Sequence, residues 1–207
     1  MDIMLKKTNA DQNMKEKIIE ESIKLFLQKS FRGTTIEDIT DAVKVTKGAF
    51  YWHFKSKNEL LETIIDEFDK GFVDSLIKTV EGYEGGFLEK FKLSHRYAAE
   101  FAYAHRELCI GFVTLSAEFV GNGIAIDLKI KSVYDKFVNF FRRLLELGKQ
   151  EGKIKDDLDV DVAAHVIVGI NNGALLEWYM YSNTIDSKKL AKTYRNISLS
   201  GILKESG

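Results

Sequence analysis

The residues best suited to chemistry in this 207-residue chain lie close together in one short stretch, Thr46–His53. Lys47 can donate to a phosphate or to a guanine edge. Thr46 would stand at the N-terminus of a helix, where backbone N–H groups and the helix dipole favour a phosphate. Gly48 would let the backbone approach a ligand closely. Three ring side chains follow: Tyr51, Trp52 and His53. The stretch favours binding of a nucleic acid, and for Trp52 both a wedge against the sugar-phosphate backbone and a packing role stay open.

These side chains need two short helices to present them. Thr35 can cap a helix that starts at Ile36, with Asp38 three residues later as the reciprocal partner. Lys44 and Val45 then break the pattern, and a second short helix is expected over residues 46–51. Two short helices joined by a tight turn form a helix-turn-helix, whose second helix can enter a DNA major groove.

The predicted helix-turn-helix carries a specific set of residues: Thr35, Ile36, Asp38, Ile39, the run from Val45 to Tyr51, His53, Phe54 and Lys57. This set resembles the signature of the tetracycline-repressor (TetR) family of bacterial transcription regulators. The resemblance covers residues 14–57 nearly position by position, and the rest of the chain only in its helical pattern. It departs at Lys44, where the family typically has glycine, and at Val43, where alanine is customary.

The resemblance implies a transcriptional repressor that binds a palindromic operator in double-stranded DNA as a homodimer and is released by a small hydrophobic effector. It places the DNA contacts at Thr34, Thr35, Thr46, Lys47, Gly48, Tyr51, Trp52, His53 and Lys57. Contacts to phosphate would position the protein but would not read the sequence of the operator.

The composition is that of a helical globular protein. With 45% hydrophobic residues the chain can bury a sizeable core, and with no proline nothing but glycine and polar breaks interrupts its helices. The single cysteine, Cys109, excludes an internal disulfide and favours a reducing, cytoplasmic compartment. The basic residues are in excess only within the first 57 residues, which include the helix-turn-helix.

We expect an all-α fold of about nine helices in two domains. Residues 1–57 would form the DNA-binding domain, with a flexible polar arm over residues 1–13 and a first helix over 14–29. Residues 58–207 would form the ligand-binding and dimerisation domain. A capping box at Ser56–Glu59 opens a long helix to about Val80, and this helix would connect the domains.

The second domain is rich in aromatic residues. Core packing explains any one of them, but together they allow an apolar pocket between helices. A candidate effector site comprises Phe91, Tyr97, Phe101, Phe112, Phe119, Tyr134, Phe137, Phe141, Asn171 and Trp178. Asn171 and its neighbour Asn172 need hydrogen-bond partners, and both a ligand and a second subunit stay open as partners.

The helix expected over residues 160–181 is apolar on nearly every face. Such a helix is buried on all sides, which in a domain of this size suggests that a second subunit covers one face. Gly169 and Gly173 would allow a close approach. We therefore expect a homodimer through the last two helices. The apolar run Ala163–Leu176 is too short to span a membrane, so no membrane association is expected.

Other chemistries find no support in the residue pattern. The four histidines show no metal-ligand spacing, Ser116 is not in a nucleophile elbow, and Cys109 has no recognisable base partner. We expect no enzyme, no metal and no cofactor. Two alternatives stay open: a helix-turn-helix regulator controlled by a protein partner without a small-molecule effector, and a helical ligand-binding protein that does not bind DNA.

Overall fold

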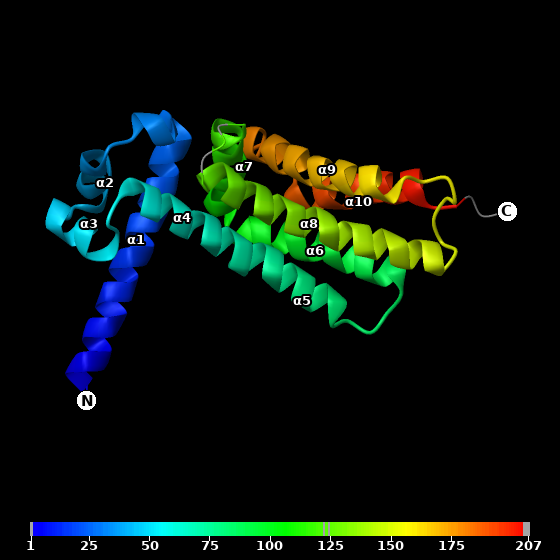
Figure 1. Ribbon diagram of the computed structural model, residues 1–207, viewed down its shortest axis with the longest axis horizontal. Coiled ribbons are helices and arrows are strands. Elements are labelled where there is room, and N and C mark those ends of the chain that lie inside the picture. Colours follow the sequence, from blue (N-terminus) through cyan, green and yellow to red (C-terminus); the bar gives the residue numbers. More distant parts are fainter. Residues whose placement is uncertain (1, 122, 124, 205–207) are drawn as a thin grey trace. The chain divides into compact units, whose positions relative to one another are not determined.

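The computed structural model describes the backbone of residues 2–121, 123 and 125–204, with side chains from residue 11 onward in those ranges. Within this part of the chain the regular structure is helical, as predicted (Figure 1). Counting α4, η1 and α5 as one continuous helix gives nine helices among the described residues. The chain forms two compact units: unit 1 comprises residues 1–68 and 107–127, and unit 2 comprises residues 69–106 and 128–207.

Unit 1 contains the predicted helix-turn-helix. Its helices are α1 (Asp2–Gly33), α2 (Ile36–Val43), α3 (Lys47–His53), α4 (Lys57–Phe68) and most of α7 (Arg106–Phe119). The small core joins Ile18, Ile39, Phe50 and Leu60, all fully buried. Two short helices cannot bury a core alone, so α1 and α4 complete it.

The first helix differs from its prediction at both ends. Residues 1–13 were predicted to be a flexible arm, but α1 begins at Asp2 and includes nearly all of them. At the other end the helix is interrupted at Ser30, with φ 63° and ψ 166°, and one further turn follows to Gly33. A non-glycine residue in this region is strained and needs support from its surroundings.

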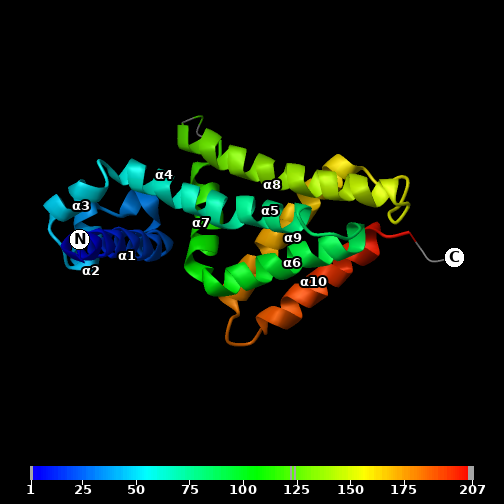
Figure 2. The same cartoon turned by 90° about the horizontal axis from the view of Figure 1, so that it is seen from below.

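Unit 2 is a helical bundle. It contains η1 (Asp69–Asp74), α5 (Ser75–Glu81), α6 (Phe87–Ala104), α8 (Ala125–Gln150) from Leu128 onward, α9 (Val160–Met180) and α10 (Ser187–Ile202). Helix α10 packs against both α6 and α9, and Figure 2 shows it beside α6. An isolated antiparallel bridge between Ile154 and Leu203 ties the end of α10 to the connection before α9.

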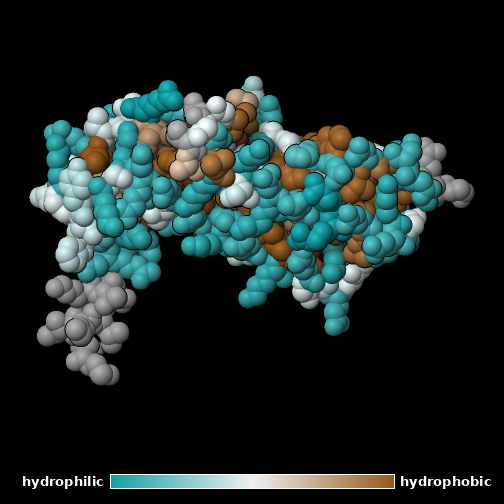
Figure 3. All heavy atoms as spheres, in the orientation of Figure 1, coloured by the Kyte–Doolittle hydropathy of each residue, from teal (hydrophilic) through white to brown (hydrophobic). Residues whose placement is uncertain are grey.

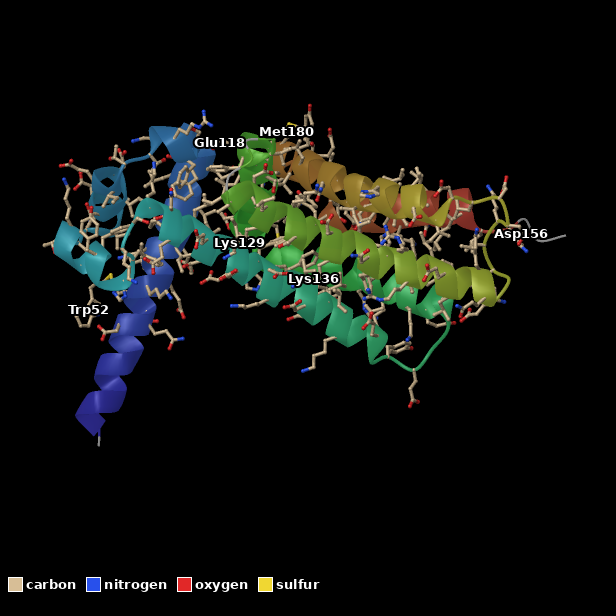
Figure 4. All side chains as sticks on the ribbon, in the orientation of Figure 1. Trp52, Glu118, Lys129, Lys136, Asp156 and Met180 are labelled. Atoms are coloured by element: carbon tan, nitrogen blue, oxygen red, sulfur yellow. The ribbon has the colours of Figure 1, made fainter. Side chains whose placement is uncertain are left out.

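The long helix predicted from residue 58 to about 80 contains a π-helical segment, η1. Lys136 of α8 holds both ends of this segment: its Nζ lies 2.6 Å from Asp69 Oδ1 and 2.8 Å from Asp74 Oδ1 (Figure 4). The capping box predicted at Ser56–Glu59, at the start of the long helix, is only partly formed. Glu59 N donates to Ser56 Oγ, whereas the Glu59 carboxylate accepts from Lys55 N instead of Ser56 N.

The apolar helix α9 is not buried all round within one chain. Ala163, Ala164, Ile167 and Val168 are buried, but Val166 is 53% exposed. Gly169 and Gly173 have open space where a Cβ would be. One face of α9 is therefore exposed within the single chain, as is expected of a helix that a second subunit covers on that face. Within the described residues, no helix is long and apolar enough to cross a membrane.

Candidate DNA-binding and effector sites

The turn before α3 is fixed by short-range hydrogen bonds. Thr35 and Asp38 form the predicted capping box: Thr35 N donates to Asp38 Oδ2 at 2.8 Å and Asp38 N donates to Thr35 Oγ1 at 3.0 Å. The Lys29 ammonium, followed by the Thr35 groups, holds the pKa of the Asp38 carboxyl well below its usual range. Lys44 ends α2 in the left-handed region, with φ 63° and ψ 50°, at the position where the family typically has glycine.

Helix α3 is anchored at its start and along one face. Thr46 is its N-cap, and the Thr46 hydroxyl accepts from Ala49 N at 3.2 Å. Phe50 and Phe54 are buried in unit 1 and their ring centroids lie 5.8 Å apart. These anchors fix the rotation of the helix about its axis and so decide which side chains face outward.

The outward face of α3 carries the predicted contact residues. Tyr51 is 53% exposed and Trp52 is 78% exposed, and Figure 4 shows Trp52 projecting from the helix. Such exposure is unusual for a tryptophan. Lys47 is exposed and pairs with Glu37 of α2 at 3.1 Å. Six of the predicted residues at α3 are exposed or half-exposed: Thr46, Lys47, Gly48, Tyr51, Trp52 and His53. Thr35 is exposed as well, but its hydroxyl donates to Asp38.

Two of the predicted contact residues support the unit from within. Thr34 is fully buried, and its hydroxyl donates to Ser30 O at 2.8 Å. Lys57 Nζ donates to Phe31 O at 2.7 Å and to Thr34 O at 2.6 Å, and it lies 4.3 Å from the centroid of the Phe31 ring. Partial burial lowers the pKa of Lys57. The placement of Thr34 and Lys57 does not favour the predicted DNA contacts.

Glu118 of α7 is a residue that the sequence did not single out. Its carboxylate accepts from Phe31 N at 3.0 Å and from Arg32 N at 3.2 Å. It therefore caps the last turn of α1, directly after the strained Ser30. The Phe31 ring also contacts Phe119, with centroids 5.2 Å apart. The partners are more than 80 residues apart in the sequence, so no local pattern could have indicated them.

Five of the ten candidate effector residues meet in one aromatic cluster of unit 2. Phe137 lies 5.2 Å from Phe141 between ring centroids, and Phe72 lies 5.1 Å from Phe101 and 5.5 Å from Phe137. The members that we predicted are Phe91, Tyr97, Phe101, Phe137 and Phe141. Phe72 and His95, which belong to the same cluster, were not predicted.

The other five candidates make other contacts. Phe112 and Phe119 belong to unit 1, where Phe112 stacks on Phe68 with centroids 4.0 Å apart. Asn171 Nδ2 donates to Ile167 O within α9, and Asn172 Nδ2 lies 3.3 Å from Tyr134 Oη. Trp178 packs near Tyr103 and under the Arg106 guanidinium. Both asparagines therefore have partners inside the chain.

Reactive groups are sparse among the described residues. No group of three or more potential metal ligands is found there. Burial raises the pKa of Cys109 to about 12, so its thiol stays protonated and unreactive at neutral pH.

Comparison with known proteins supports the resemblance to the TetR family. Residues 18–64 match the model for "Bacterial regulatory proteins, tetR family", and residues 72–201 match that for "YsiA-like protein, C-terminal region". The HTH-type transcriptional repressor DhaR of Mycobacterium sp. (strain GP1) is 24% identical over 170 residues, covering 82% of this chain and 84% of DhaR.

Two solved structures show the same fold. The MbdR regulator of Azoarcus sp. CIB has a TM-score of 0.83 and 25% identity, covering 92% of this chain and 100% of MbdR. The regulator FadR of Bacillus subtilis, solved in complex with stearoyl-CoA, has a TM-score of 0.73 and 22% identity, covering 90% of this chain and 98% of FadR. The expected function class, a DNA-binding transcriptional repressor, is confirmed at the level of the family. Since the matched regions span the helix-turn-helix and most of the remaining chain, the protein belongs to the TetR family of bacterial regulatory proteins.

Proposed function

We propose that this regulator reads its operator with the exposed face of α3. The observation that carries the proposal is the exposure of Lys47, Tyr51 and Trp52 on a helix that Phe50 anchors by its buried side. Lys47 is suited to phosphate or guanine, and the two rings offer apolar contact with a polar tip. The surface ion pair with Glu37 costs little to exchange for a DNA phosphate, since such pairs contribute about 0–1 kcal/mol.

The proposed homodimer forms through α9 and α10. Within one chain these helices expose large apolar side chains: Val162, Val166, Leu176 and Met180 of α9 and Ile197 of α10. Figure 3 shows hydrophobic surface over α9. Contiguous exposed apolar surface marks an interaction site. The open space at Gly169 and Gly173 would let a partner helix approach closely. Two copies would present their α3 helices about 34–36 Å apart to the half-sites of a palindrome.

The proposed effector is a small hydrophobic molecule bound by unit 2, with the aromatic cluster around Phe137 and Phe141 as its apolar wall. The complex of Bacillus subtilis FadR with stearoyl-CoA supports this class of ligand, a long apolar chain on a polar head. Binding would favour a conformer with weaker operator affinity, which requires the ligand to prefer that conformer. We keep residues 1–57 as the proposed DNA-binding domain and 58–207 as the proposed effector and dimerisation domain.

The test is operator binding by a variant of the α3 face. Random duplexes selected with the wild-type protein supply the operator probe, and fluorescence anisotropy measures its affinity. We expect Lys47→Ala/Tyr51→Ala to weaken binding roughly tenfold to a hundredfold and to reduce its salt dependence. Lys78→Ala, on an exposed part of α5, is the control. Unchanged, salt-independent binding by the double variant would overturn the proposal.

A further inference from the structure

A cleft of about 760 Å³ lies between α6 and α10, entirely within unit 2. Neither this cleft nor a second cavity, beside Leu27 and Leu115 of unit 1, is lined by any of the ten predicted effector residues. Its volume falls within the usual range for sites that hold small molecules, about 300–1,000 Å³.

The cleft is strongly basic. Its cations are Lys92 and Arg96 of α6 and Lys188, Lys192 and Arg195 of α10. They outnumber its two carboxylates, Glu89 and Glu100. The chain as a whole has a formal net charge of −1, so this concentration of positive charge is local.

These five cations have no carboxylate partners in the part of the chain that the structure describes. Among the described residues none of them makes an ion pair, whereas Lys24, Lys29, Lys47 and Lys136 all do. On each helix the cations are three or four residues apart and therefore lie on one face. Like charges at this spacing destabilise a helix slightly, and an anion between the two rows would relieve the repulsion.

His95 lines the inner side of the cleft and carries an unpartnered atom. The residue is only 2% exposed, and its Nδ1 lies 2.9 Å from Phe91 O. Because a carbonyl oxygen can only accept, Nδ1 carries the proton and Nε2 is left as an acceptor. Nε2 is buried and has no partner among the described residues. A buried acceptor without a donor is costly, so this atom marks a position for an N–H or O–H of a ligand.

Arg195 adds a donor at the same cleft. Its Nε is buried without a partner among the described residues, while its Nη2 makes only a 3.3 Å contact with Asn196 Oδ1. A planar guanidinium is well suited to a phosphate, which can accept two of its N–H groups at once. The cleft therefore offers cations for an anion, a buried donor and a buried acceptor.

We infer that the cleft between α6 and α10 binds the phosphate groups of a phosphorylated small molecule, held between the cations of the two helices. The phosphates could belong to a free nucleotide or to the head of a coenzyme A thioester. Both supply anionic oxygens together with N–H and O–H donors for His95. The cleft shares no residue with the α3 face, so its occupancy can be measured on the protein alone, without operator DNA.

The test is isothermal titration calorimetry of the full chain with four probes: ADP, coenzyme A, stearoyl-CoA and stearate. We expect the three phosphorylated probes to bind and their affinity to fall as the salt concentration rises. We expect Lys92→Gln/Lys192→Gln to weaken this binding roughly tenfold, since charge-assisted hydrogen bonds are removed. The matched control, Lys78→Gln/Lys189→Gln, removes two exposed charges of unit 2 outside the cleft and should leave affinity unchanged.

The probes separate the two sources of phosphate. Binding of ADP as tight as that of stearoyl-CoA would indicate a nucleotide site, whereas much tighter binding of the thioester would indicate a coenzyme A site. Binding of stearate alone would overturn the inference and leave the proposed hydrophobic effector intact. Equal loss in the control variant, or no binding of any phosphorylated probe, would also overturn it. Failure to bind operator DNA would count against the proposed function and not against this cleft.

Discussion

The α3 face of unit 1 and the α6–α10 cleft of unit 2 both carry exposed cations, but they are built for different anions. On the α3 face Lys47 is paired with Glu37 and stands beside two exposed rings on a convex helix. In the cleft five cations, which make no ion pair among the described residues, surround a concave volume. A convex helix fits the groove of an extended polymer, whereas a concave cluster fits a compact anion. The two regions should therefore respond to different variants.

The largest expected effect is that of a variant that breaks the proposed dimer, which should affect operator binding and not the cleft. Val166→Asp places a carboxylate in the proposed dimer face, where burying an unpaired charge is strongly unfavourable. We expect a monomer by light scattering and a loss of operator affinity of roughly a hundredfold or more, because one copy reaches only one half-site. Cleft binding should be unchanged. Leu128→Asp, at an exposed leucine of α8, is the control, and a dimeric Val166→Asp protein would rule out this interface.

The second prediction concerns the inner side of the cleft. Burial lowers the pKa of His95 to about 4, below its ordinary value of 6.5. Between pH 4 and pH 6.5 the unfolded state therefore binds more protons than the folded state. The stability that the neutral, buried His95 ring contributes is complete above pH 6.5 and is lost as pH falls toward 4. Between pH 6.5 and pH 4 we expect the free energy of unfolding of the wild type to fall by on the order of 3 kcal/mol more than that of His95→Leu. Urea unfolding at each pH measures this difference.

A control for this measurement is His105→Leu, which removes an exposed imidazole just beyond the end of α6. Its pH profile should follow that of the wild type. If His95→Leu also follows the wild-type profile, the His95 ring is not held neutral by burial and its role beside the cleft must be reconsidered.

The third prediction concerns the α3 face alone. Trp52→Ala should weaken operator binding by roughly tenfold, since an exposed ring of this size contributes mainly through contact with DNA. The melting temperature and ADP binding should stay as in the wild type, because the side chain packs little within unit 1. Unchanged operator affinity would show that Trp52 projects away from the bound duplex.

The smallest expected effect lies in the turn that orients α3. Lys44→Gly should stabilise the protein by on the order of 0.5–1 kcal/mol, because glycine adopts a positive φ without strain. Asp41→Gly, inside α2, should instead destabilise it by about 1 kcal/mol. Chemical denaturation measures both. Destabilisation by Lys44→Gly would mean that the lysine side chain contributes more than its backbone strain costs.

The features that could be predicted from the sequence are those that depend on interactions between residues close together in the chain. The caps at Thr35 and Thr46 join residues three apart, so their pattern is visible in the sequence. The hydrogen bonds of Lys57 could not be predicted, because its acceptors, Phe31 O and Thr34 O, lie 26 and 23 residues away.

The cleft was missed for the same reason, since its two rows of cations come from helices about 100 residues apart in the chain. The aromatic content of unit 2 predicted a cluster of rings but could not divide them between the units. Phe112 looks no different from Phe137 in a sequence, yet it packs on Phe68 in unit 1.

The contact of Lys136 with the π-helical segment has a consequence for the winding of the chain. Asp69 and Asp74 are five residues apart, a separation that places side chains about 140° apart around an α-helix but on one side of a π turn. One ammonium group can therefore hold both carboxylates only while the segment is π-wound. The ion pair between Lys136 and Asp74 therefore depends on the π winding. Its loss would indicate that the segment had returned to an α-helix.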